Sequence, residues 1–136
     1  MRQIEKSSLM FMVSMMLSSF IWADHKSAHV DVKVPELTVK AVKGGQIFGV
    51  NCAGCHGNNG EGGSGGPPLI HDIYNPGHHA NSAFIQAMQK GTRSHHWRFG
   101  DMPAQKQMGL SDMMFVVKFI REVQQANGIK TKTHNM

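Results

Sequence analysis

The segment Cys52-Ala53-Gly54-Cys55-His56 constrains this chain more than any other, because it contains the only two cysteines among the 136 residues. Two thiols three residues apart lie on one turn of the chain, close enough to bond to two neighbouring groups of one planar cofactor. A histidine directly after the second cysteine can then lie beneath the centre of that cofactor. This spacing predicts covalent haem attachment through Cys52 and Cys55, with His56 as an axial ligand of the iron.

A zinc site is the main alternative that the residues leave open. It would use Cys52, Cys55, His71, and His78 or His79. The gap between these histidines exceeds the usual three to five residues, and the site would give His56 no role. A thioredoxin-like pair needs a βαβ setting, and a disulfide across so short a loop gains little stability from chain entropy. We therefore favour haem.

Residues 1–23 resemble a secretory signal peptide. A basic start precedes a largely apolar stretch over residues 8–22, and Ala23 is a small residue at the expected cleavage point, so that Asp24 begins the mature chain. The apolar stretch is short for a membrane span, which takes about 20 residues. An uncleaved N-terminal anchor is the alternative. After removal of the signal we expect no membrane span.

The remaining residues are enough for one small domain. The net charge of the chain is +5, and its charges are spread evenly. No basic run alternates with aromatic residues, so the sequence does not predict nucleic-acid binding. The charge could favour an acidic partner surface, although a solvated face explains it equally well.

Helical patterns predict an all-α fold without strands. We expect a flexible lead-in over residues 24–38, a helical domain over 39–127 and a loose tail over 128–136. The first helix is expected over residues 38–51. The second is expected over residues 81–90, with Gly91 at its end.

The third helix has the clearest pattern, since its apolar residues recur at helical spacing. Ser111 is its expected N-cap, Asp112 lies in its first turn, and Gly128 follows its end. In contrast, the glycine-rich segment from Gly57 to Pro68 has too few apolar residues for a core of its own. A buried haem would supply the missing core.

Taken together, these motifs resemble a class I mono-haem cytochrome c over about residues 40–127. The matching elements are Gly44, Ile47 and Phe48 before the cysteines, Gly66-Pro67-Pro68-Leu69 after them, Met102-Pro103, and Leu110-Ser111-Asp112 with Phe119-Ile120. The resemblance implies a small cytochrome c fold of three to four helices wrapped around one covalent haem c. It also implies that Gly44 packs against Phe119, and that the Pro67 carbonyl accepts a hydrogen bond from His56.

The second axial ligand is expected to be Met102, which follows Cys55 by 47 residues in a turn-prone segment. A thioether ligand raises the haem potential. His95 or His96 is the alternative and implies a lower potential. The other methionines considered are more typical of a helix face or core: Met88, Met108, Met113 and Met114.

Donors for the haem propionates are expected before Met102, at Arg93, Trp97 or Arg98. The histidine pairs His78-His79 and His95-His96 depart from the common family pattern. Their simplest role is at the surface or in local hydrogen bonds. The alternatives are propionate contacts, a bound metal or a pH-sensitive partner face.

The resemblance implies one-electron transfer in the periplasm, because cytochromes c mature outside the cytoplasm. No catalytic residue is expected, and the partners are redox proteins, with the chain a monomer or a subunit of a redox complex. Two alternatives remain open. One is a dedicated cytochrome subunit of a periplasmic dehydrogenase or oxidase, and the other is a haem sensor or enzyme with an exchangeable sixth position.

Overall fold

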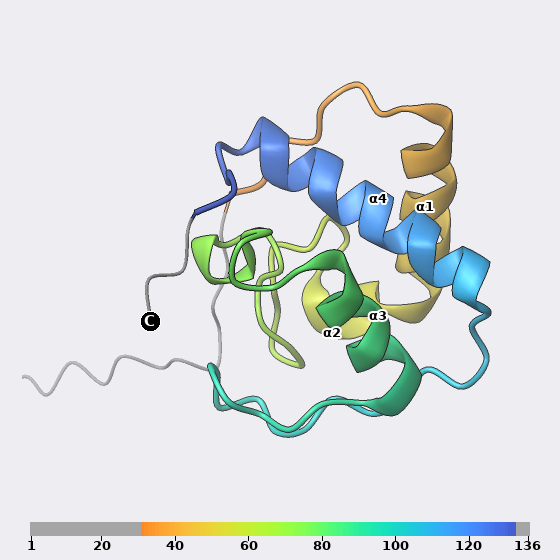
Figure 1. Cartoon of the computed structure of the whole chain (residues 1–136), viewed down its shortest axis with the longest axis vertical. Coiled ribbons are helices and arrows are strands. Elements are labelled where there is room, and N and C mark those ends of the chain that lie inside the picture. Colours follow the sequence, from red (N-terminus) through yellow and green to blue (C-terminus); the bar gives the residue numbers. More distant parts are fainter. Residues whose placement is uncertain (1–30, 133–136) are drawn as a thin grey trace, which may run out of the picture.

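The computed structural model describes residues 31–132. The expected signal peptide, its cleavage point, the first part of the lead-in and residues 133–136 lie outside the described residues. The elements follow one another as α1 (Val39–Asn51), α2 (Ala53–His56), a 3₁₀ turn (Asp72–Tyr74), α3 (Asn81–Lys90) and α4 (Leu110–Ala126). The prediction of an all-α fold is confirmed (Figure 1).

Helices α1 and α4 cross at close range, and Gly44 lies at the crossing. A Cβ atom on Gly44 would lie 1.9 Å from the Phe115 carbonyl oxygen and 3.0 Å from Phe119 Cβ. Next to this contact, the rings of Phe48 and Phe119 pack with their centroids 5.3 Å apart. The expected contact between Gly44 and Phe119 is therefore confirmed. Glycine lets the two backbones approach to a distance that any side chain would prevent.

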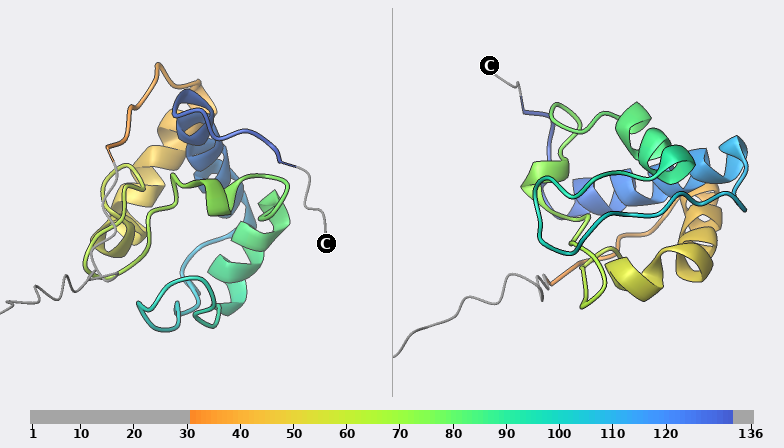
Figure 2. Two further views of the ribbon diagram at one scale, coloured as in Figure 1. Left: turned by 90° about the vertical axis from the view of Figure 1, so that its left-hand side faces the viewer. Right: turned by 90° about the horizontal axis from the view of Figure 1, so that it is seen from below.

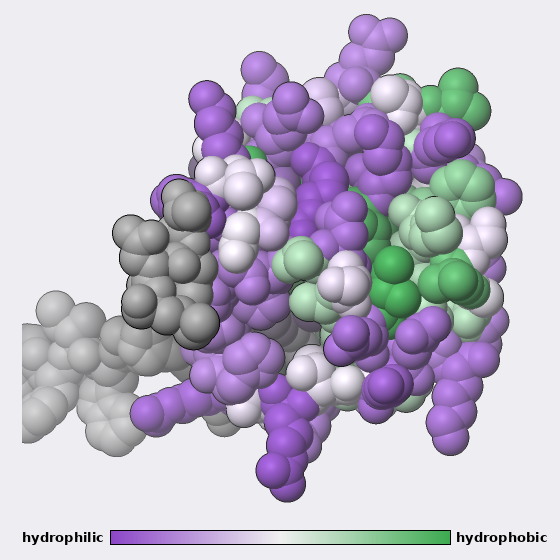
Figure 3. Space-filling model, in the orientation of Figure 1, coloured by the Kyte–Doolittle hydropathy of each residue, from purple (hydrophilic) through white to green (hydrophobic). Residues whose placement is uncertain are grey.

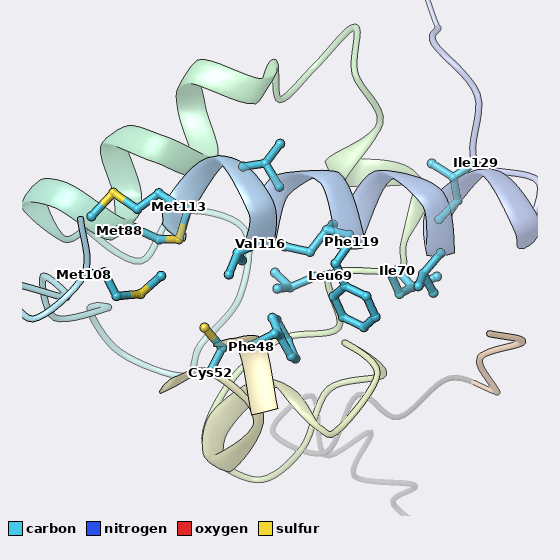
Figure 4. Packing of buried hydrophobic residues seen from close by; sticks show 13 residues of the cluster. Phe48, Cys52, Leu69, Ile70, Met88, Met108, Met113, Val116, Phe119 and Ile129 are labelled. Atoms are coloured by element: carbon cyan, nitrogen blue, oxygen red, sulfur yellow. The ribbon is translucent and has the colours of Figure 1, made fainter. Parts of the chain in front are cut away.

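The core lies along the inner face of α4, where Val116, Phe119, Ile120 and Val123 are almost fully buried. Figure 4 shows Met88, Met108 and Met113 together at one end of this helix and Ile129 at the other, with Phe48 and Leu69 below the middle. Most of the apolar burial therefore joins α4 to the segments around it. The face in Figure 3 carries mainly hydrophilic side chains, with the apolar ones gathered toward one side.

Two helix starts differ from the sequence-based expectation. Helix α4 is preceded by Gly109 as its N-cap, not by Ser111, and the Gly109 carbonyl accepts the first helical hydrogen bond from Met113. Ser111 thus lies inside the first turn and does not cap the helix. At α1, Thr38 is the N-cap, but its hydroxyl and backbone N–H both donate to Glu122 of α4. Tertiary contact replaces the local cap.

The chain segments flanking the helices pack more closely than expected. The backbone of Lys33 exchanges two hydrogen bonds with the Asn127 side chain. Ile129 is buried, and the Lys132 ammonium pairs with Asp72 at 2.6 Å. Residues 128–132, expected as a loose tail, thus contact the domain at Ile129 and Lys132, and the lead-in contacts it at Lys33.

Between α3 and α4 the chain runs out and returns along itself, as the paired traces at the lower edge of Figure 1 and in Figure 2 show. One antiparallel bridge joins Thr92 to Met102. Residues 31–132 contain no β-strand beyond this single bridge. None of the described helices has the length and apolar character that crossing a membrane requires.

Candidate functional site

The cysteine motif lies where the chain turns out of α1. Cys52 ends that helix and is buried, Cys55 lies in α2 and is exposed, and the two thiols form no disulfide. Burial, together with the nearby Cys55, raises the pKa of the Cys52 thiol to about 11. Because neither thiol is part of a disulfide, both sulfur atoms are available for thioether bonds. The buried one, that of Cys52, faces the interior.

His56 is held in one tautomer. Its Nδ1 lies 2.9 Å from the Pro67 carbonyl oxygen, so this nitrogen carries the proton and donates it. Burial lowers the pKa of His56, and the hydrogen bond to Pro67 opposes this shift only in part. The ring is thus neutral at pH 7, with the Nε2 lone pair free for a metal. A hydrogen-bonded second nitrogen is typical of metal-ligating histidines.

The glycine-rich loop wraps closely around the motif. A Cβ on Gly65 would lie 3.3 Å from Cys55 Sγ, and one on Gly66 would lie 3.2 Å from His56 Cε1. The loop also closes on itself, since the Gly62 N–H donates to the His56 carbonyl at 2.7 Å. The segment that lacks apolar residues therefore serves to bring Pro67 to the imidazole.

A cavity of about 440 Å³ opens beside the motif and is lined mostly by apolar side chains. This volume is in the usual range for cofactor sites. Cys52 and His56 of the cysteine motif border this cavity. Helix α3 contributes Phe84 and Met88 to its lining, and the segment after α3 contributes Met102. A thiol, a metal-binding nitrogen and a thioether thus border one mostly apolar cavity, and these donors fit a haem and its iron.

The cavity separates the methionine candidates. Met88 and Met102 line it, whereas Met108 and Met113 are buried elsewhere in the core and Met114 is exposed. The backbone of Met102 is fixed by two hydrogen bonds to Thr92, at 2.9 and 3.0 Å. Met102 is therefore anchored at the cavity without being part of a helix face, unlike Met88.

The expected propionate donors divide in the same way. Arg93 and Trp97 line the cavity, and Arg98 does not. The Trp97 indole N–H is buried and has no hydrogen-bond partner among the described residues. The Arg93 guanidinium and the Trp97 indole are thus available to an acidic cofactor edge.

Sequence reasoning missed Tyr74. It is the only tyrosine of the chain, it lines the cavity, and burial raises the pKa of its phenol to about 12. Its protonated hydroxyl can donate a hydrogen bond to an anionic group. A lone tyrosine in a polar segment was the one available signal, since nothing in the local pattern shows where it points.

A large, mostly apolar cavity beside a C-x-x-C-H segment, with the histidine held in its metal-binding tautomer, defines an all-α protein that holds a covalent haem. The sequence model of the Cytochrome c family matches residues 41–124, more than half of the chain. The chain belongs to this family and carries covalently bound haem c, which makes it a haem-based electron-transfer protein. No curated protein matches the sequence.

Proposed function

We propose that this protein is a periplasmic carrier of single electrons whose haem iron is ligated by His56 and Met102. One observation carries the proposal: the neutral His56 ring and the anchored Met102 border the same apolar cavity. If His56 and Met102 both hold the iron, no open site would remain on it for a substrate. The haem supplies the one-electron couple when bound.

The surrounding residues would favour electron transfer over ligand chemistry. Apolar side chains such as Phe48, Leu69 and Ile120 line the cavity and would give a bound haem mostly apolar surroundings. The Pro67 carbonyl orients the His56 ring, and the bridge to Thr92 fixes the backbone that carries Met102. Groups already fixed in place need little rearrangement when the charge of a metal changes.

Replacing Met102 by Ala should remove the weak near-infrared band of an Fe–S(Met) bond from the oxidised protein. The midpoint potential should also fall, because a thioether ligand raises the haem potential. Absorption spectra of the haem-loaded variant and a redox titration measure both effects. Met114→Ala is the matched control, since Met114 is exposed on α4 outside the cavity, and it should leave both unchanged.

Met88→Leu tests the other methionine of the cavity, which α3 presents from an apolar face. It should retain the near-infrared band. If the band is lost in Met88→Leu and survives in Met102→Ala, the iron ligand is Met88 and our assignment is wrong.

His95 and His96 also border the cavity, so a second histidine ligand is the alternative to Met102. Ligation by two histidines would give a lower potential and no Fe–S(Met) band in the wild-type protein.

Export is a separate part of the proposal and rests on the sequence of residues 1–23 alone. Mass spectrometry of the mature protein should find Asp24 at the N-terminus, and an intact residue 1 in a membrane fraction would favour an anchor.

A further inference from the structure

Two histidine pairs that lie 17 residues apart in the sequence, His78-His79 and His95-His96, meet beside the cavity. His78 Nε2 is 3.3 Å from His96 Nε2, and the rings of His79 and His96 have centroids 5.1 Å apart. One ring nitrogen from each of His78, His79 and His96 falls within a set whose members all lie within 4.8 Å of one another. Three imidazoles this close can share one ion.

We propose that His78, His79 and His96 form a second metal site, separate from the haem iron, that binds one divalent transition-metal ion of the Zn²⁺ or Cu²⁺ type. Imidazole nitrogens suit these ions, whereas Mg²⁺ and Ca²⁺ require oxygen ligands. No carboxylate or thiol belongs to this set of ligand atoms. The proposal holds with Met102 or Met88 as the second axial ligand of the haem, and it requires that His96 is not that ligand.

The His79 ring has the orientation that metal binding needs. Its Nδ1 donates to the Ile73 carbonyl at 2.8 Å, which leaves the Nε2 lone pair for an ion.

The backbone that carries the first pair is held from two sides. Arg121 of α4 donates to the carbonyls of Tyr74 and His79. The Asn75 side chain accepts from the backbone N–H of His78 at 3.2 Å and is itself buried. This half of the site is thus preformed on a rigid part of the fold, which lowers the entropic cost of binding an ion.

The second pair comes from the segment between α3 and α4. The His95 and His96 rings are tilted against each other with centroids 4.3 Å apart, and the Nδ1 of His95 lies 2.7 Å from the Arg93 carbonyl. Because the Nδ1 of His95 is engaged in this contact, its Nε2 is the ring nitrogen left as a further ligand. Three histidines with a fourth beside them match the ligand number of tetrahedral zinc.

Calorimetric titration of the metal-stripped, haem-loaded protein tests the site, with ZnCl₂, CuCl₂ and MgCl₂ as titrants. We expect one Zn²⁺ or Cu²⁺ per chain and no binding of Mg²⁺. His96→Ala and His78→Ala should each weaken binding at least as much as loss of an outer partner of a ligating histidine, about 10- to 100-fold. The nitrogen hyperfine pattern of bound Cu²⁺ should lose one imidazole in each variant.

His71→Asn is the matched control, because His71 lies outside the set and Asn retains an acceptor for the Ile73 N–H. It should bind the ions with wild-type affinity. An unchanged haem spectrum in His78→Ala and His71→Asn, which both lie outside the cavity lining, verifies folding and separates this test from the haem assignment. Absence of saturable one-to-one binding, or equal affinity in wild type and His96→Ala, would overturn the proposal and leave the histidines as a hydrogen-bonded cluster.

Discussion

Haem should remain attached to the wild-type polypeptide during denaturing electrophoresis and be absent from a variant with both Cys52→Ala and Cys55→Ala. The two cysteines are the only thiols of the chain and form no disulfide, so each is available for one thioether bond. Each single variant can keep at most one bond, and its yield of mature protein should fall. Haem staining of the gel, normalised to protein, measures the loss, which should be complete in the double variant.

Met114→Ala is the control for expression and export, since this exposed side chain lies far from the motif in sequence. Haem that is extracted from the wild type by acidic organic solvent would contradict covalent attachment. Stoichiometric zinc at Cys52 and Cys55 would contradict it as well, because the same thiols cannot serve both groups.

Replacing Gly44 by Ala should destabilise the folded protein strongly. The added Cβ would lie 1.9 Å from the Phe115 carbonyl, a distance that forces α1 and α4 apart. Overpacking of this kind costs about 1–3 kcal/mol and at times more, and a rigid backbone atom places this site at the upper end, about 3 kcal/mol. Alanine regains about 1 kcal/mol of helix propensity, so the net loss should be about 2 kcal/mol or more.

Gly49 in the same helix provides the matched control. A Cβ at Gly49 meets no atom within 4 Å, so Gly49→Ala should be neutral or stabilise the fold by up to about 1 kcal/mol. Denaturant unfolding of the haem-loaded proteins, followed by helical circular dichroism, compares the two variants. Equal stability of both variants would mean that the helices do not cross at Gly44.

Local signals explain why much of the fold could be predicted. The bounds of α3 could be predicted from the spacing of its apolar residues. Its end could be predicted from Gly91, since glycine readily adopts the positive φ found there. Family resemblance supplied the contacts that local patterns cannot give, including Gly44 against Phe119 and Pro67 against His56. Both contacts are present.

What the sequence did not predict depends on tertiary contact. Ser111 looks like an N-cap, but the chain enters α4 from Gly109 and leaves Ser111 inside the helix. Ile129 is too isolated in the sequence to indicate a core position, yet it is buried. The two histidine pairs meet only because Arg121 fixes one loop and the returning segment before Met102 brings the other.

The most direct test of the central claim is a spectroelectrochemical titration of the purified haem protein, with and without carbon monoxide. An electron carrier with two protein ligands should give one reversible one-electron transition whose midpoint is the same in both conditions. If carbon monoxide binds the reduced protein, it stabilises that state and raises the midpoint. A raised midpoint in the wild type would contradict the carrier function and indicate an open sixth position.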